Sequence, residues 1–266
     1  MKDICCDLRA EYNELAALAA SLGDQQWQLR SDFYGWTPWD EIAHLCYFDE
    51  ASLKSMTDAQ AFLRDAQALN GRIAQGEEIS AIARVAYGRL DGPALLAYWR
   101  DRYASLVGAL ERVDAKARLS WYGPQMSARS FAAARLMEAW AHGQDVWDLL
   151  RRRRTATARL KHIAHMGVLT FGWTFANRGM AVPAVVPSVT LAAPDGGSWS
   201  WGDPSGSDYV RGTAEDFCLL VTQRRHLADT GLQYSAGAVR QWLSMAQCFA
   251  GPPADGPPAG LRRVQY

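Results

Sequence analysis

The sequence lacks an excess of charge of either sign, because 28 lysines and arginines balance 28 aspartates and glutamates among its 266 residues. Such a chain has no overall field that would attract nucleic acid or an anionic membrane. It also lacks a long apolar run, since the uncharged stretch from Gly179 to Pro194 contains three prolines and is too short to cross a bilayer as a helix. We therefore expect no nucleic-acid partner and no membrane association.

Cysteine is scarce and follows no pattern. The five cysteines are odd in number and include no C-x-x-C pair, so we predict neither a disulfide framework nor a thiolate zinc site. A secretion signal is also missing, because the first residues mix charges where a signal peptide needs an unbroken apolar stretch. The expectation is a soluble cytoplasmic protein with reduced thiols.

Helical periodicity dominates the first two thirds of the chain. Apolar residues at helical spacing predict long helices over residues 3–22, 93–113 and about 156–177. Another helix begins at Thr37, where Pro38 and Asp40 complete a variant of the capping box. A further one runs from Ser127 or Ser130 into the arginines at 151–154, and residues 58–88 are typical of shorter helical pieces. Long helices joined by short loops predict an up-and-down four-helix bundle.

The pattern changes near residue 181. Short alternating segments separated by turn residues predict a small sheet, and Thr213 with Asp216 predicts a helix through residue 221. A last helix is expected over residues 236–249. We thus predict a mainly α protein in three parts, namely a helical bundle over residues 1–180, a small α+β domain over 181–250, and an extended or mobile Pro/Gly-rich tail over 251–266.

Two of the predicted helices carry side chains that can bind a metal ion. His44 ends the segment W-T-P-W-D-E-I-A-H, and Glu138 and His142 lie in E-A-W-A-H-G-Q-D. Residues four apart share one helix face, so Glu138 and His142 can reach one ion, with Asp145 about one turn further along. Three protein ligands leave one position open for water or substrate. These side chains are therefore candidate ligands of a divalent metal ion, with zinc as the first choice, although nickel and iron accept the same ligands.

The same spacing has ordinary explanations. A Glu–His pair four residues apart stabilises any exposed helix, and a buried histidine commonly satisfies a hydrogen bond in the core. His162 and His165 form a rival ligand pair three residues apart, with no carboxylate one turn away. Spacing alone leaves these alternatives open.

Both segments resemble the metal-binding segments of the mycothiol-dependent maleylpyruvate isomerase family, which lies within the DinB-like four-helix-bundle superfamily. The resemblance covers most of the chain, including the order of a bundle followed by a small α+β domain. It implies that His44, Glu138 and His142 bind the metal and that Asp145 is the active-site acid. It also implies a functional arginine in L-L-V-T-Q-R-R, where Arg224 and Arg225 are both candidates. The alternative is that both arginines are surface charges near a helix end.

The resemblance implies a metal-dependent enzyme that uses a low-molecular-weight thiol, mycothiol first of all, as cofactor or co-substrate. It would be an isomerase or transferase, catalysing isomerisation, addition or transfer on a small acidic or conjugated substrate. Metal coordination would remove the thiol proton, with Asp145 as acceptor and an arginine holding the substrate. Two alternatives remain open at this point: a hydrolase that uses metal-activated water, and a non-catalytic protein that binds a metal or a small molecule.

Overall fold

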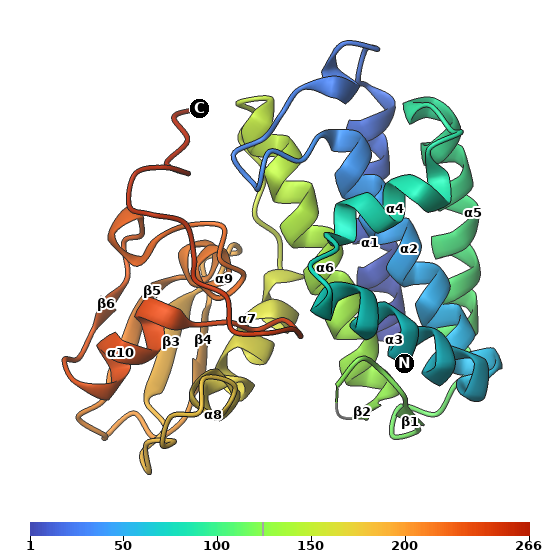
Figure 1. The fold of residues 1–266 in the computed structure, drawn as a ribbon. Helices are drawn as coiled ribbons and strands as arrows, with labels where there is room; N and C mark the ends of the chain where they lie inside the picture. The colour runs from blue at the N-terminus through green and yellow to red at the C-terminus, as the bar shows by residue number, and fades with distance from the viewer. Residues whose placement is uncertain (124) are drawn as a thin grey trace. The chain divides into compact units, whose positions relative to one another are not determined.

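The computed structural model describes residues 1–123 and 125–266 and divides the chain into two compact units, Met1–Leu150 and Arg151–Tyr266 (Figure 1). The predicted mainly helical class is confirmed. The boundary between the units follows Leu150 and not residue 180. The reason is that α7 (Leu160–Leu169) packs against α9 (Ala214–Val221) and so belongs to the second unit. The two helices approach so closely at Gly167 that a side chain there would clash with Phe217 and Val221.

The first unit contains the predicted bundle of long helices, with shorter elements inserted between them. A hairpin of two short antiparallel strands, which the sequence did not predict, precedes the last helix of the bundle. The elements of this unit are α1 (Lys2–Ala20), a 3-10 turn (Gln26–Gln28), α2 (Pro38–Thr57), α3 (Ala59–Ala74), α4 (Ile79–Tyr87), α5 (Gly92–Glu111), β1 (Arg118–Leu119), β2 (Met126–Ser127) and α6 (Ala128–Leu149).

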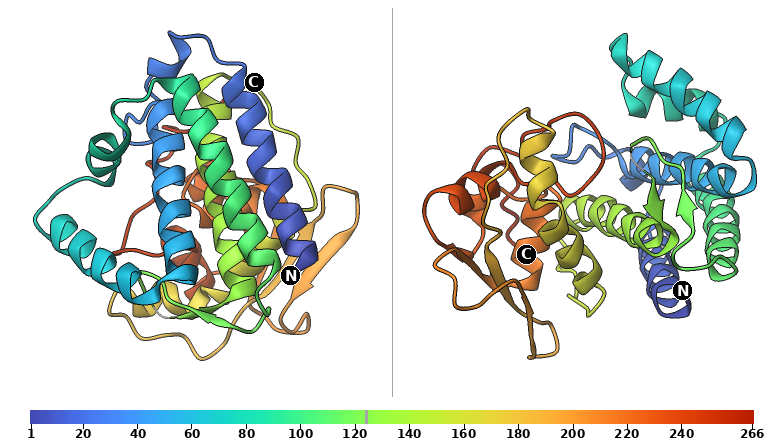
Figure 2. Two further views of the ribbon diagram at one scale, coloured as in Figure 1. Left: turned by 90° about the vertical axis from the view of Figure 1, so that its right-hand side faces the viewer. Right: turned by 90° about the horizontal axis from the view of Figure 1, so that it is seen from below.

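The helices of the bundle are ordered differently from a simple up-and-down arrangement, in which each helix runs antiparallel to the one before. Helices α1 and α2 each pack against both α5 and α6 (Figure 2). Two hydrogen bonds show that α5 runs parallel to α2. Trp39, at the start of α2, donates to the carbonyl of Leu90 just before α5, and Glu50, further along α2, accepts from Tyr98, further along α5. The segment holding α3 and α4 returns the chain to the start of α2, which allows this parallel pair.

The predicted capping box at the start of α2 is confirmed. The Thr37 hydroxyl accepts a hydrogen bond from the backbone N–H of Asp40 at 3.3 Å, and the Asp40 carboxylate accepts one from the backbone N–H of Thr37 at 2.9 Å. Arg84 of α4 donates to the same Asp40 oxygen at 2.6 Å. These contacts fix the residue at which α2 begins and therefore the face on which His44 lies, about two turns further along.

Replacing Thr37 with alanine is expected to lower the free energy of unfolding by about 1 kcal/mol, the usual cost of losing an N-cap side chain. Chemical denaturation followed by circular dichroism measures this change. Thr57→Ala is the control, because the Thr57 hydroxyl lies in the exposed last turn of the same helix and donates to the carbonyl of Leu53. Equal effects of the two substitutions would contradict a role of the cap in setting the helix start.

A buried polar network joins the helices of the bundle at its centre. The Asp49 carboxylate of α2 accepts hydrogen bonds from Tyr12 of α1 at 2.5 Å, Trp99 of α5 at 2.8 Å and Arg135 of α6 at 2.9 Å. All four residues are at least 98% buried. Because each donor comes from a different helix, the network sets the register of all four at one level of the bundle.

The second unit is an α+β arrangement around a four-stranded sheet of order β4-β3-β5-β6. Strands β3 and β5 are parallel, and the other neighbouring strands are antiparallel. The predicted helix over 156–177 is interrupted at Thr170, and Thr213 caps α9 as predicted by accepting a hydrogen bond from Asp216. The remaining elements are α8 (Phe171–Ala176), β3 (Ser188–Ala192), β4 (Ser198–Trp201), β5 (Tyr209–Thr213), a 3-10 turn (Leu227–Asp229), β6 (Gln233–Tyr234) and α10 (Ala238–Met245).

The tail over residues 251–266 forms no helix or strand, and hydrogen bonds hold it to the rest of the second unit. Gly260 donates its backbone N–H to Asp229 at 2.8 Å, and Arg262 donates to the carbonyl of Gln223 at 3.1 Å. Among the described residues of the whole chain, no helix combines the length and apolar character that a membrane crossing requires.

Candidate metal centre

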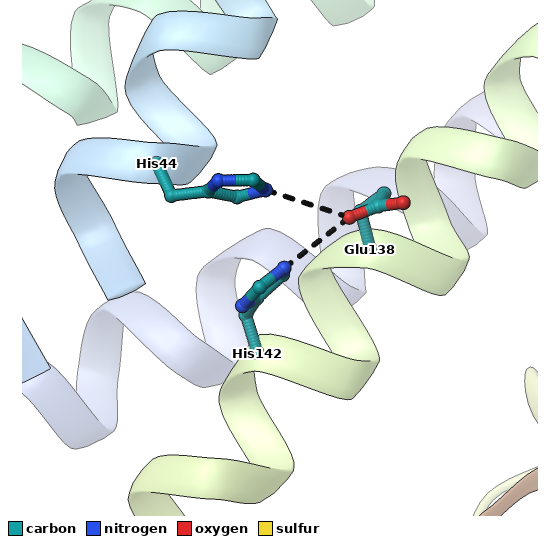
Figure 3. Close-up of side chains that lie close together, drawn as sticks. All are labelled: His44, Glu138 and His142. Atoms are coloured by element: carbon teal, nitrogen blue, oxygen red, sulfur yellow. Dashed lines mark ion pairs between the residues drawn. The ribbon is translucent and has the colours of Figure 1, made fainter. Parts of the chain in front are cut away.

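His44, Glu138 and His142, which we call the donor triad, converge within the helical bundle (Figure 3). His44 extends from α2, and the other two side chains extend from α6. One oxygen of Glu138, Oε2, lies 3.7 Å from His44 Nε2 and 3.3 Å from His142 Nε2. The two imidazole rings lie 4.3 Å apart, centre to centre. The structure thus brings together the three side chains that the sequence nominated as metal ligands.

The packing of α2 against α6 explains this convergence. The two helices run antiparallel, with the Arg135–Asp49 ion pair at one level and His44 opposite Glu138 at the next. Arg135 precedes Glu138 by three residues, so both lie on the face of α6 that meets α2. The buried network therefore sets the register in which His44 reaches its two partners.

The spacing of the donor atoms fits a bound metal ion. Separations of 3.3 and 3.7 Å are long for hydrogen bonds between a ring nitrogen and a carboxylate. Two ligands at about 2.1 Å from a zinc ion, at the tetrahedral angle, lie about 3.4 Å apart. The side chain of Glu138 is 22% exposed, whereas that of His142 is 6% exposed, so solvent reaches the carboxylate of the centre. Two imidazoles and one carboxylate with an accessible side suit a site with an open coordination position.

The charge state of Glu138 suits a metal ligand. Burial raises the pKa of this carboxyl, but its interactions with the nearby imidazoles of His142 and His44 outweigh burial and hold the pKa well below its usual range. The carboxylate is therefore ionised at neutral pH and through mildly acidic conditions, and it is ready to bind a cation without losing a proton.

Aromatic rings pack against the two histidines of the donor triad. The Trp36 ring stacks against His142 at 5.8 Å and lies 5.2 Å from the His44 ring, centre to centre. Phe33 meets His142 edge-on at 5.5 Å, and Phe48 packs on His44 at 4.8 Å. A tight turn aims Trp36 inward, because Tyr34 and Gly35 both adopt positive φ angles, of 50° and 69°. These rings restrict the motion of the imidazoles and exclude water from one side of the centre.

Two more carboxylates lie beside His142. The ring Nδ1 is 2.7 Å from Glu41 Oε2, and Glu41 is 1% exposed. Asp145 is 3% exposed and offers an oxygen within 4.8 Å of donor atoms of both His142 and Glu41. Asp145 was nominated from the sequence, and Glu41 was not. The one feature of the sequence that could have indicated Glu41 is its position in the first turn of the helix, one turn before His44.

Arg224 and Arg225 lie in the second unit, just after α9 ends. Gln223 takes a positive φ of 57°, and the backbone N–H groups of both arginines then bond to the carbonyl of Leu219. The guanidinium of Arg224 donates to the carbonyl of Thr222 at 2.8 Å, and both residues are less than 10% exposed. This burial argues against the alternative of two simple surface charges.

The rival pair His162 and His165 lies on α7. His165 Nδ1 accepts a hydrogen bond from Trp201 Nε1 at 3.1 Å. Over residues 1–123 and 125–266, this pair belongs to no group of three or more donor side chains close enough to hold an ion. The geometry therefore favours the donor triad over the rival pair.

Comparison with known proteins gives three findings. The family model described as mycothiol maleylpyruvate isomerase N-terminal domain matches residues 8–147, which include the whole donor triad. Uncharacterized proteins from two strains of Mycobacterium tuberculosis are each 42% identical to this chain over 253 residues, covering 94% of the chain and 96% of the relative. The crystal structure of the mycothiol-dependent maleylpyruvate isomerase superposes with a TM-score of 0.53 at 16% identity, over 82% of this chain and 87% of that one. A histidine-to-alanine mutant of that enzyme gives the same TM-score.

Proposed function

The chain belongs to the mycothiol maleylpyruvate isomerase N-terminal domain family, and from this premise we propose that it is a thiol-dependent isomerase with a divalent metal ion at the donor triad. The observation that carries the proposal is the convergence of two Nε2 atoms and one carboxylate oxygen at 3.3 and 3.7 Å within the region that matches the family. Zinc is the first choice of metal, and nickel or iron would accept the same ligands. Mycothiol is the first choice of thiol.

The surrounding residues would support thiol chemistry in distinct ways. A divalent cation bound here would lower the pKa of a coordinated thiol, which is about 8.5 when free. Asp145, buried beside His142, would accept the proton that the thiol loses. Trp36 and Phe48 would keep water away from the imidazoles, which favours a sulfur nucleophile over hydroxide.

The substrate class follows from the reaction. Addition of the thiol sulfur to a conjugated double bond leaves a carbon–carbon single bond that can rotate, and loss of the same thiol then restores the double bond in the other geometry. The thiol returns unchanged, so no oxidant or reductant is needed. A small conjugated acid such as maleylpyruvate fits this scheme. The assignment of Arg224 or Arg225 to the substrate carboxylate, through a two-pronged contact, stays a prediction from the sequence.

Metal removal tests the proposal. Protein stripped with a chelator is expected to lose turnover of maleylpyruvate, and added zinc is expected to restore it, with elemental analysis giving one ion per chain. The assay is run with mycothiol, with glutathione and without thiol, and product geometry is followed by nuclear magnetic resonance. Cleavage products formed with water and without thiol would instead indicate a hydrolase, and binding without product would indicate a non-catalytic protein. Undiminished turnover by the metal-free protein would overturn the proposal.

A further inference from the structure

The two nitrogens of the His142 ring face two different carboxylates. Nε2 lies 3.3 Å from Glu138 Oε2, and Nδ1 lies 2.7 Å from Glu41 Oε2. Glu41 belongs to α2, whereas Glu138 and His142 belong to α6. From this asymmetry we infer that Glu41 is a positioning residue, which holds the His142 proton on Nδ1 and leaves Nε2 free to bind the metal. This inference rests on the proposed metal centre.

The distances assign different roles to the two carboxylates. A separation of 2.7 Å is typical of a hydrogen bond between an imidazole N–H and a carboxylate. It is too short for two ligands of one zinc ion, which lie about 3.4 Å apart. Glu41 therefore accepts a hydrogen bond from Nδ1, whereas Glu138 and Nε2 stand at the spacing of neighbouring ligands. A ligating histidine whose other nitrogen donates to a carboxylate has a fixed ring orientation and a more basic ligand atom.

The separation of 2.7 Å between His142 Nδ1 and Glu41 Oε2 also argues against a second metal ion beside the donor triad. Glu41, His142 and Asp145 form another group of donors within 4.8 Å of one another. An ion bound to Nδ1 in this group would have to break the hydrogen bond between Nδ1 and Glu41, because atoms 2.7 Å apart are too close to be two ligands of one zinc ion. We therefore expect one ion per chain, held at the donor triad.

The position of Glu41 in its helix suits this role. It lies in the first turn of α2, where the positive end of the helix dipole stabilises a negative charge. It follows Asp40, which the capping box and Arg84 hold in place. His44 lies one turn further along the same helix, so α2 supplies one ligand directly and orients a second ligand that belongs to α6. Any shift of α2 along α6 would therefore disturb two of the three ligands together.

The test compares three substitutions by zinc affinity, measured in competition with a chromophoric chelator. Glu41→Ala is expected to weaken zinc binding roughly 10- to 100-fold, the usual effect of removing such a carboxylate. Glu41→Gln keeps an oxygen that can accept the same hydrogen bond, so its affinity is expected between those of Glu41→Ala and the wild type. Glu50→Gln is the matched control on α2, since Glu50 accepts hydrogen bonds from Tyr87 and Tyr98 and not from the donor triad. Its zinc affinity is expected to stay at the wild-type level.

A second readout follows the Nδ1 proton of His142 by nuclear magnetic resonance. We expect slow solvent exchange of this proton in the wild type and in Glu50→Gln, and fast exchange in Glu41→Ala. Two zinc ions per wild-type chain, or a folded Glu41→Ala variant with wild-type affinity, would overturn the inference. If the wild type bound no metal, the proposed function would fail. The role of Glu41 can still be tested in the metal-free protein, through solvent exchange of the Nδ1 proton of His142. An exchange rate unchanged by Glu41→Ala would refute that role.

Discussion

Replacing His142 with alanine is expected to remove the bound metal and the thiol-dependent turnover together. The substitution deletes one of the three proposed ligands and leaves Glu138 with a single imidazole partner, on the neighbouring helix. Loss of a ligand should weaken binding by more than the roughly 10- to 100-fold that follows loss of a supporting carboxylate. Zinc should therefore be absent after dialysis, and turnover of maleylpyruvate with mycothiol should fall to background. Elemental analysis and the isomerisation assay, applied to the same preparation, measure both effects.

The control for this substitution is His165→Ala. His165 lies on α7 in the second unit and accepts a hydrogen bond from Trp201, so its loss should leave metal content and turnover unchanged. The comparison also tests the rival histidine pair directly. Metal loss in the His165 variant but not in the His142 variant would move the metal site to the second unit and reject the donor triad. Circular dichroism of both variants is the measurement that checks whether each one folds.

The parts of the donor triad that could be predicted are those that depend on local geometry. Glu138 and His142 share a face of α6 because they lie four residues apart, whatever surrounds the helix. The N-cap at Thr37 sets the start of α2, so the depth of His44 within that helix also follows from the sequence. The meeting of His44 with the other two donors needed a bundle in which α2 and α6 are neighbours, and the family resemblance indicated such a bundle.

The parts that could not be predicted depend on which helices meet. Periodicity shows that α5 has an apolar face but not that this helix runs parallel to α2, which depends on the path of α3 and α4. Glu41 gave little signal for the same reason: its partner is a histidine 101 residues further along the chain. Phe48 lies four residues after His44 on α2, so helix spacing allows their contact. It was missed because an aromatic residue at this spacing is also typical of ordinary core packing.

The buried network around Asp49 is where the largest loss of stability is expected. Asp49→Ala would leave the Arg135 guanidinium buried without its carboxylate, and Tyr12 and Trp99 would lose the acceptor that they share. Breaking one side of a buried ion pair costs about 3 to 5 kcal/mol. The free energy of unfolding of the first unit should fall by that amount, as measured by urea denaturation with far-ultraviolet circular dichroism. Zinc affinity should fall as well, because the network sets the register of α2 against α6.

A surface ion pair between α2 and α3 separates this effect from a general loss of charge. Asp65 pairs with Lys54 of α2, and both side chains are about half exposed, so Asp65→Ala should cost less than about 1 kcal/mol. The double variant Asp49→Ala/Arg135→Met removes both buried charges together, and its cost should therefore be clearly smaller than the sum of the two single substitutions. Additive costs, or an Asp49→Ala variant as stable as Asp65→Ala, would mean that the carboxylate does not organise the bundle. In that case the register that brings His44 to Glu138 would have to come from apolar packing alone.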